Sequence, residues 1–314
     1  MRKPHKLPPA GTERKIIALQ DVRKIHADIK AGGVKKIILD TDTYNEIDDQ
    51  FALAWAVLSD KIDLLSVNAA PFLNNRSVSP EDGMEKSYNE IMRIMDLIAP
   101  EKKPPVYRGS TAFLADKKTP IVSDAAQNIV DTVMNSEGTV YVVAIGAITN
   151  VASAIIMKPE ITEKMVVVWL GGHALEWKDS REFNMVQDVK SAQIVFDSGV
   201  PFYQIPCMGV CDHLMTTIPE LEACLGGKNP LCDYLVNIVK GYTNDPYCWS
   251  KVIWDVSAIA ALVTPDALDS VVIPSHMVTD NSTYSTDLSR HHMIYVRSLN
   301  RDKIFRALFN DLTK

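Results

Sequence analysis

The stretch that decides the fold occupies residues 37–49 and reads Ile37-Ile38-Leu39-Asp40-Thr41-Asp42-Thr43-Tyr44-Asn45-Glu46-Ile47-Asp48-Asp49. Apolar residues lead into a group of four aspartates, and an apolar helical pattern follows directly in residues 51–58. A buried strand that breaks into a loop and then a helix is typical of the first βα unit of an α/β sheet. The stretch therefore predicts an α/β fold with acidic residues at the end of its first strand.

The four aspartates of this stretch are interpreted as a metal or catalytic site. Carboxylates so close in sequence repel one another unless a cation lies among them. Oxygen ligands of this kind suit Ca²⁺ or Mg²⁺. The alternative is that Asp48 and Asp49 only cap the following helix, whose N-terminus favours negative charge. Capping does not account for Asp40 and Asp42, which precede the loop.

Composition indicates an ordinary globular protein, with 46% hydrophobic and 23% charged residues. A net charge of -6 favours neither nucleic acid nor an anionic membrane as a partner. Residues 1–14 lack the apolar core of a signal peptide, and no apolar run is long enough to span a membrane. The five cysteines are then expected to be reduced thiols in a cytoplasmic protein.

Strand and helix patterns alternate along most of the chain. Strands are expected near residues 35–42, 62–69, 140–144, 165–170, 201–206, 270–279 and 292–296, with helices near 48–59, 80–98, 123–134, 188–196, 231–242, 254–263 and 304–312. Because no linker or repeat interrupts them, residues 34–314 are predicted to form one doubly wound domain with a mostly parallel central sheet and surrounding helices. Residues 1–33 are interpreted as an N-terminal extension, with a short helix that packs on the domain or on a neighbouring subunit.

Loops that follow the predicted strands carry side chains suited to ligand binding. In a doubly wound sheet, ligands bind outside the carboxyl ends of the strands. Besides the acidic loop, these ends carry Asn74 and Asn75, Ile145-Gly146, Gly172-His173 and Glu182-Phe183-Asn184. We expect the loops to meet at one edge of the sheet and to form a pocket there.

Several ordered motifs make the chain resemble the nucleoside hydrolase family. That family carries Asp-x-Asp-Pro-Gly-x-Asp-Asp between its first strand and helix, and here Asp40-Thr41-Asp42 and Asp48-Asp49 match the two ends. Five residues, Thr43 to Ile47, stand where the family usually has three. Further matches are Gly146-Ala147-Ile148-Thr149-Asn150, Gly171-Gly172, Glu182-Phe183-Asn184, Asp188-Val189-Lys190-Ser191-Ala192 and Trp254-Asp255-Val256. The resemblance implies a Rossmann-like fold and calcium-dependent hydrolysis of the N-glycosidic bond of ribonucleosides to free base and ribose.

Roles for individual residues follow from the same resemblance. It implies that Ca²⁺ is bound by the side chains of Asp42, Asp49 and Asp255 and by the backbone carbonyl of Ile145. It implies that the ribose hydroxyls are held by Asp48, Glu182 and Asn184, joined by Asn74 or Asn75. Asp42 would accept a proton from the attacking water, and the metal would lower the cost of forming hydroxide. We expect a homodimer or homotetramer whose partner is a small-molecule nucleoside.

The position that would protonate the leaving base departs from the family pattern. Many members have a histidine directly before the late metal-binding aspartate, whereas this chain has Trp254. In this it is similar to the purine-specific members, which stack the base between tryptophans, so purine nucleosides are expected to be favoured. The alternative is that Trp254 only begins an apolar helix face. Candidates for the opposite wall are Trp177, Trp249, Tyr247, Phe72 and Tyr44, and His173 is a candidate acid.

Parts of the sequence are compatible with two other functions. Asp40-Thr41-Asp42-Thr43 after an apolar strand also resembles the nucleophile motif of haloacid-dehalogenase-type phosphatases, but the downstream Gly-Asp-x-x-x-Asp metal pair of that class is absent. A non-catalytic ribose- or nucleoside-binding protein would retain the pocket without turnover. The longer Thr43–Ile47 segment and the missing histidine are compatible with such a protein.

Overall fold

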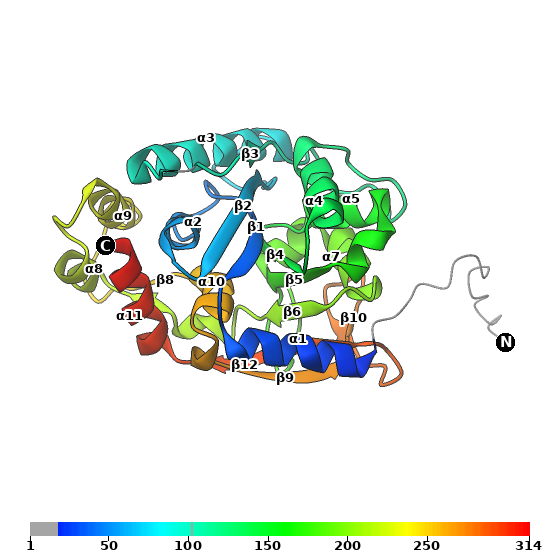
Figure 1. Cartoon of the computed structure of the whole chain (residues 1–314). Coiled ribbons are helices and arrows are strands. Elements are labelled where there is room, and N and C mark those ends of the chain that lie inside the picture. The colour runs from blue at the N-terminus through cyan, green and yellow to red at the C-terminus, as the bar shows by residue number, and fades with distance from the viewer. Residues whose placement is uncertain (1–17, 102) are drawn as a thin grey trace.

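The computed structural model describes residues 18–101 and 103–314, and an eight-stranded sheet forms its centre (Figure 1). In spatial order the strands are β3 (Val106–Tyr107), β2 (Ile62–Ala69), β1 (Lys35–Thr41), β4 (Val140–Ala144), β5 (Met165–Leu170), β6 (Phe202–Ile205), β12 (His292–Leu299) and β9 (Leu268–Pro274). All neighbours pair in parallel except β12 and β9, which are antiparallel. The prediction of a mostly parallel central sheet is confirmed.

Helices cover both faces of this sheet (Figure 1). They are α1 (Leu19–Ala31), α2 (Asp49–Leu58), α3 (Pro80–Ile98), α4 (Asp124–Asn135), α5 (Thr149–Met157), α6 (Phe183–Gln187), α7 (Val189–Asp197), α8 (Ile218–Cys224), α9 (Pro230–Lys240), α10 (Val256–Val263) and α11 (Arg301–Leu312). Three short 3-10 helices are η1 (Pro159–Glu163), η2 (Cys211–His213) and η3 (Pro265–Ala267). Two short antiparallel pairs join β7 (Met215–Thr216) to β8 (Lys251–Val252) and β10 (Met277–Val278) to β11 (Tyr284–Ser285).

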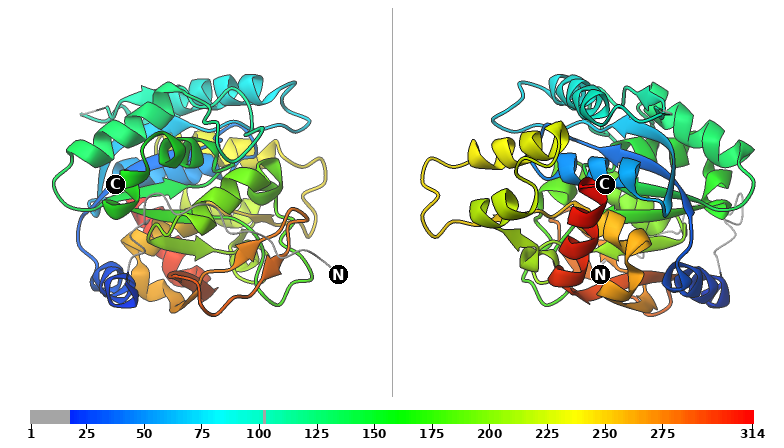
Figure 2. Two further views of the ribbon diagram at one scale, coloured as in Figure 1. Left: turned by 90° about the vertical axis from the view of Figure 1, so that its right-hand side faces the viewer. Right: turned by 60° about the vertical axis from the view of Figure 1, so that its left-hand side comes forward.

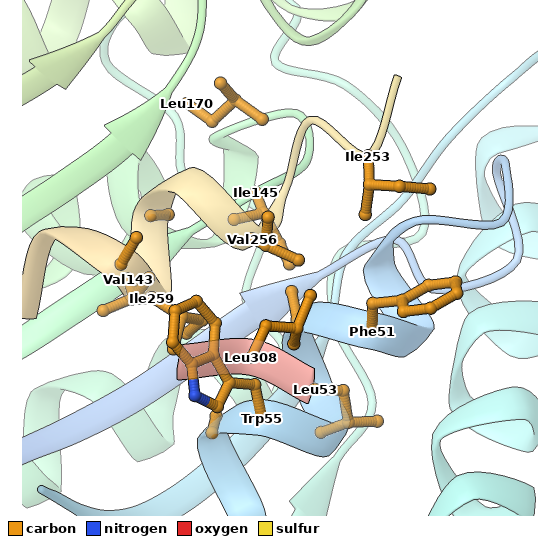
Figure 3. Packing of buried hydrophobic residues seen from close by; sticks show 14 of the residues in the cluster. Phe51, Leu53, Trp55, Val143, Ile145, Leu170, Ile253, Val256, Ile259 and Leu308 are labelled. Carbon is orange, nitrogen blue, oxygen red and sulfur yellow. The ribbon is translucent and has the colours of Figure 1, made fainter. Parts of the chain in front are cut away.

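The core has two parts because strand residues alternate between the faces of the sheet. Ile37 and Leu39 of β1 belong to a cluster with α2, α10 and α11, whereas Ile38 belongs to a second cluster with α4, α5 and α7. A strand covered on both faces is apolar along its whole length, which explains the unbroken apolar run before Asp40. In the first cluster, Phe51 and Trp55 of α2 lie near Val256 of α10 (Figure 3).

The order of the strands reverses between β1 and β4. From β1 the chain proceeds through β2 to β3 on one side, and from β4 through β5 to β6 on the other. Asp40 pairs with Ala144 in the register of these two strands, and the Ile145 N–H donates to the Asp40 carbonyl at 2.9 Å. Asp42, the first residue after β1, and Ile145, the first after β4, therefore leave the sheet at the same edge. A crevice at such a reversal is the usual place for a ligand in an open α/β sheet.

Several elements differ from the sequence prediction. The helix expected at Asp21–Ile29 is α1, which packs on β12, β9 and η3, while residues 1–17 of the predicted extension lie outside the described part. The strand expected at residues 270–279 ends at Pro274, and β10 then pairs with β11 instead. Helix α8 was not predicted, and it lies beside α9 at one side of the molecule (Figure 2). None of the described helices is long and apolar enough to cross a membrane.

Candidate active site

Three carboxylates from two separate segments meet at the crevice between β1 and β4. Asp48 and Asp49 begin α2, and Asp255 stands directly before α10. One oxygen of each lies within 4.8 Å of the corresponding oxygens of the other two, and all three side chains are buried. They meet because α2 and α10 pack against each other through their apolar faces. Such spacing suits oxygens that surround one Ca²⁺, whose Ca–O distances are about 2.3–2.6 Å.

Asp42 is the fourth acid of this site. Its side chain is fully buried, and among residues 18–101 and 103–314 neither of its carboxylate oxygens has a hydrogen-bond partner. A Cβ atom at position 146 would lie 2.9 Å from the Asp42 carboxyl carbon, so only glycine fits there without displacing the acid. A buried carboxylate without donors is costly unless a cation compensates its charge.

The four acids repel one another, and this repulsion raises the pKa values of several of them. Burial, together with the charges of Asp49 and Asp48, raises the pKa of Asp42 well above its ordinary value. Burial and the charge of Asp48 raise the pKa of Asp49 to about 7. Burial and the charges of Asp48, Asp49 and Asp42 likewise raise the pKa of Asp255. A divalent cation among the four would remove the repulsion and keep them ionised.

The aspartates do not serve as helix caps. Neither Asp48 nor Asp255 makes a side-chain capping hydrogen bond to its own helix. Instead, Asp48 Oδ2 accepts the backbone N–H of Trp254 at 2.9 Å, and Asp49 Oδ1 accepts the hydroxyl of Thr41 at 2.5 Å. The capping alternative is therefore wrong for the side chains, although the positive ends of α2 and α10 still favour negative charge at this place.

Asp40 stands apart from the other acids. It is buried in β1, where its Oδ1 accepts the Asn150 side-chain amide at 2.8 Å. Burial raises its pKa to about 7 even though Asn150 opposes the shift. The same amide of Asn150 also donates to the Ala69 carbonyl, so Asp40 helps to join β1, β2 and α5 beneath the site.

A pocket of about 280 Å³ opens beside the acids, and we name it the carboxylate pocket. Its lining comprises Asn45, Glu46, Asp48, Ile145, Leu170, His173, Arg181, Glu182, Phe183, Asn184, Cys207, Met208, Trp254 and Asp255. Seven residues that the sequence singled out thus lie together: Asp48, Ile145, His173, Glu182, Asn184, Trp254 and Asp255. The expectation that strand-end loops would converge to form a pocket holds for this group.

Glu182 and Asn184 are fixed by the loops that surround them. Glu182 accepts the backbone N–H groups of Gly172, Asn184 and Met185, at 2.9, 2.7 and 3.1 Å. Burial nevertheless raises its pKa to about 7. The Asn184 side-chain amide donates to the carbonyls of Ile145 and Leu170, at 3.1 and 3.0 Å. Since both amide hydrogens are then engaged, the side-chain oxygen of Asn184 is the atom free to accept from a ligand hydroxyl.

The predicted base-binding residues are only partly brought together. Trp254 and His173 both line the carboxylate pocket, and Phe183 is a further aromatic ring in its wall. Burial lowers the pKa of His173, and its Nδ1 accepts the Met208 backbone N–H at 3.4 Å. The five rings expected opposite Trp254 (Trp177, Trp249, Tyr247, Phe72 and Tyr44) do not belong to this lining. Phe72, for example, is fully buried, and Tyr247 is 84% exposed.

Asn74 and Asn75 lie in a second pocket, of about 570 Å³, rather than in the carboxylate pocket. We name it the tyrosine pocket, after Tyr44, Tyr234 and Tyr242 in its wall. The Asn74 side-chain amide donates to Asn45 Oδ1 at 2.7 Å, so it supports the acidic loop. Asn74 or Asn75 was expected to join Asp48 and Glu182 in holding the ribose. The structure places neither asparagine in the lining of the carboxylate pocket.

A family model described as inosine-uridine preferring nucleoside hydrolase matches residues 37–306 of the chain. The chain belongs to this family. It is accordingly a hydrolase that acts on N-glycosyl bonds. The phosphatase alternative, which rested on Asp40-Thr41-Asp42-Thr43 alone, is overturned by a match that runs from β1 to α11.

Individual nucleoside hydrolases are similar over most of the chain. The pyrimidine-specific ribonucleoside hydrolase RihB of Escherichia coli O9:H4 (strain HS) is 26% identical over 265 residues, which cover 74% of this chain and 80% of that protein. The structure of a purine-preferring ribonucleoside hydrolase from Gardnerella vaginalis superposes with a TM-score of 0.72 at 21% identity, covering 89% and 98% of the two chains. An inosine-uridine preferring hydrolase from Bacillus anthracis gives 0.69 at 17%, covering 89% and 99%. The structural matches confirm the fold.

Sequence reasoning missed several residues of this nucleoside hydrolase site. Arg181, Cys207 and Met208 line the carboxylate pocket, and Lys251 is a buried cation beside it. Burial opposes the charge of Lys251, but the carboxylates of Asp48 and Glu46 outweigh it and raise the pKa of the lysine. Nothing in the local pattern around Lys251 indicates this pairing, because Glu46 is 205 residues away.

Proposed function

We propose that the protein hydrolyses the N-glycosidic bond of purine ribonucleosides with a Ca²⁺ ion held by its buried aspartates. The observation that carries the proposal is the meeting of Asp48, Asp49 and Asp255. Asp48 and Asp255 line a pocket that also holds Glu182, Asn184 and Trp254, and the charge of Asp42, unpartnered within the described chain, acts on Asp255. Membership of the nucleoside hydrolase family supplies the reaction class.

The donor set fits a hard divalent cation. Asp49 and Asp255 would hold it together with Asp42, whose charge acts on Asp255, while Asp48 lies beside them and Ile145 lines the pocket. All these donors are oxygens, which suits Ca²⁺ better than zinc or copper. When bound, the ion would supply positive charge that offsets the aspartates and eases ionisation of a nearby water.

The residues of the chain then have distinct tasks. Asp42, whose oxygens receive no hydrogen bond within the described chain, accepts the proton of the attacking water. Acceptor oxygens of Asp48, Glu182 and Asn184 hold the ribose hydroxyls, and the negative charges stabilise the oxocarbenium-like state at the sugar. Burial lowers the pKa of His173 and so favours its neutral form, and we assign it a hydrogen bond to the base rather than transfer of a proton.

The leaving base is activated by stacking in this proposal. Trp254 and Phe183 are the large aromatic rings in the carboxylate pocket, and a purine offers a broader ring to such walls than a pyrimidine does. The purine preference of the Gardnerella vaginalis enzyme agrees with this assignment, whereas the pyrimidine specificity of RihB opposes it. Turnover of a panel of nucleosides separates the two substrate classes.

Inosine, adenosine and guanosine are expected to be cleaved faster than uridine and cytidine, with kcat/KM as the measure. Trp254→Ala should lower kcat as well as raise KM, because stacking matters more as charge builds on the departing base. Loss of an aromatic contact of this kind should reduce kcat/KM for inosine by about tenfold. Trp177→Ala, at a ring outside the pocket lining, is the matched control.

Three results would count against this assignment. Faster cleavage of uridine than of inosine by the parent enzyme would overturn the purine preference. A rise in KM alone in Trp254→Ala would make the indole a passive wall. Tight nucleoside binding without any release of base would favour the non-catalytic binding protein.

A further inference from the structure

The wall between the two pockets comes from the five-residue segment Thr43–Ile47. Asn45 and Glu46 are the residues that line both the carboxylate pocket and the tyrosine pocket. The segment is held in place from the tyrosine-pocket side: the Arg76 guanidinium donates to the Glu46 carbonyl at 2.7 Å and lies 4.4 Å from the centre of the Tyr44 ring. The Thr43–Ile47 segment is therefore held in place by side-chain contacts, and we call it the partition between the two pockets. It is longer than the matching segment of the family motif.

Glu46 is held at this partition by an ion pair with Lys251. The Lys251 ammonium bonds to Glu46 Oε2 and lies 5.1 Å from the centre of the Tyr242 ring. The lysine side chain is 9% exposed, whereas that of Glu46 is 37% exposed. Burial of the ammonium favours a fixed direction of Glu46, because moving this carboxylate away would remove one of the two carboxylates, Glu46 and Asp48, that stabilise the buried charge of Lys251. Glu46 thus holds its carboxylate in a fixed direction in the wall of the carboxylate pocket.

We propose that Glu46 is a specificity-determining residue that accepts an N–H group from the leaving base of the substrate. This proposal rests on the proposed function, which places the ribose at Asp48, Glu182 and Asn184 in the carboxylate pocket. In this proposal the base extends from that ribose toward Glu46. The edge of the base that is remote from the sugar then contacts the Glu46 carboxylate. Since an ionised carboxylate only accepts hydrogen bonds, that edge must carry a donor.

The substrate class that follows is a ribonucleoside whose base bears an N–H donor on its outer edge, such as the amino group of adenosine. A base with hydrogen at that position leaves the carboxylate without a ligand partner. A bond to a charged acceptor is about twice as strong as one between neutral groups, so the discrimination should exceed that of an uncharged contact. Lys251 acts here as a positioning residue, because its ammonium bonds to the Glu46 carboxylate; its charge also acts on Asp48.

The test compares adenosine with purine riboside, which lacks only the amino group. The measured quantity is the ratio of their kcat/KM values in the parent enzyme, Glu46→Gln and Lys251→Met. Taking each ratio relative to the parent cancels the intrinsic difference in leaving-group reactivity. We expect the preference for adenosine to fall about tenfold in Glu46→Gln, and in the same direction in Lys251→Met. Glu222→Gln is the matched control, since Glu222 forms an ion pair with Lys240 at 2.6 Å in which both side chains are about half exposed.

A second readout does not depend on turnover. Free adenine should bind more tightly than free purine, measured by calorimetry, and Glu46→Gln should reduce that difference. A ratio in Glu46→Gln within twofold of the parent value, with both ribosides cleaved, would overturn the role of Glu46 and leave the proposed function intact. No cleavage of either riboside by the parent enzyme would instead contradict the proposed function. In that case, equal binding of adenine and purine would overturn the role of Glu46 as well.

Discussion

Asp49→Asn should abolish nucleoside hydrolysis while leaving the protein folded. The substitution removes one of the charges that would hold the cation, yet the amide oxygen can still accept the Thr41 hydroxyl that now bonds to Asp49 at 2.5 Å. Changes in outer partners of metal ligands typically cost about 10- to 100-fold. Loss of a charge that contacts the ion directly should therefore lower kcat/KM by at least about 100-fold.

Thermal unfolding separates this effect from loss of structure. The repulsion that raises the pKa of Asp49 comes partly from Asp48, so the variant without calcium should be at least as stable as the parent. Saturating Ca²⁺ should raise the unfolding temperature of the parent much more than that of Asp49→Asn, because a ligand stabilises only the state that binds it. Asp63→Asn, at an exposed carboxylate in β2, serves as the control. Full activity in Asp49→Asn would remove this aspartate from the metal site.

A ribonucleoside should be cleaved far faster than its 2′-deoxy analogue. The sugar end of the carboxylate pocket is rich in buried acceptors, namely the oxygens of Asp48, Asp255, Glu182 and Asn184. A substrate without the hydroxyl leaves such acceptors desolvated and unpaired. Sites that hydrogen-bond a hydroxyl discriminate against the analogue lacking it by on the order of 10⁴-fold.

The comparison requires kcat/KM for inosine, 2′-deoxyinosine and 3′-deoxyinosine in the same buffer. Both deoxy compounds should react poorly, since the pocket is assigned to both hydroxyls. Asn184→Ala should reduce the ratio of kcat/KM for inosine to kcat/KM for the deoxy compounds, because it removes one acceptor that lies in the pocket wall. Its amide also ties the Ile145 and Leu170 carbonyls, so thermal unfolding of the variant must be measured alongside. Equal rates on inosine and 2′-deoxyinosine would contradict the assignment of this pocket to ribose.

The sequence predicted the sheet because its strands carry strong signals. Apolar runs such as Val140–Ala144 are buried on both faces, and helices such as α3 have a capping Ser79 followed by Pro80. The sequence did not predict several of the short elements of the fold. Strands β7 and β8 have two residues each, and their pairing depends on contacts between segments about 35 residues apart. Local periodicity does not report such contacts.

For the site, the sequence predicted which loops meet but not how each side chain is used. Asp48, Asp49 and Asp255 come together as their motif positions suggested. Asn74 and Asn75 line the tyrosine pocket instead of the carboxylate pocket. The longer acidic loop turns toward them, and its Asn45 accepts a hydrogen bond from the Asn74 side-chain amide. The pairing of Glu46 with Lys251 depends on tertiary packing alone. The division of the chain into an extension and a domain, the homodimer or homotetramer and the cytoplasmic location remain predictions.

The most direct test of the account is calcium-dependent release of base and ribose. The parent enzyme is treated with a chelator, dialysed, and assayed with inosine for hypoxanthine and reducing sugar before and after Ca²⁺ is restored. We predict that activity is lost with the metal and returns with calcium, in equal amounts of base and ribose. Full activity in the chelated enzyme, with the four buried aspartates unchanged, would contradict the central claim that these residues act through a bound cation.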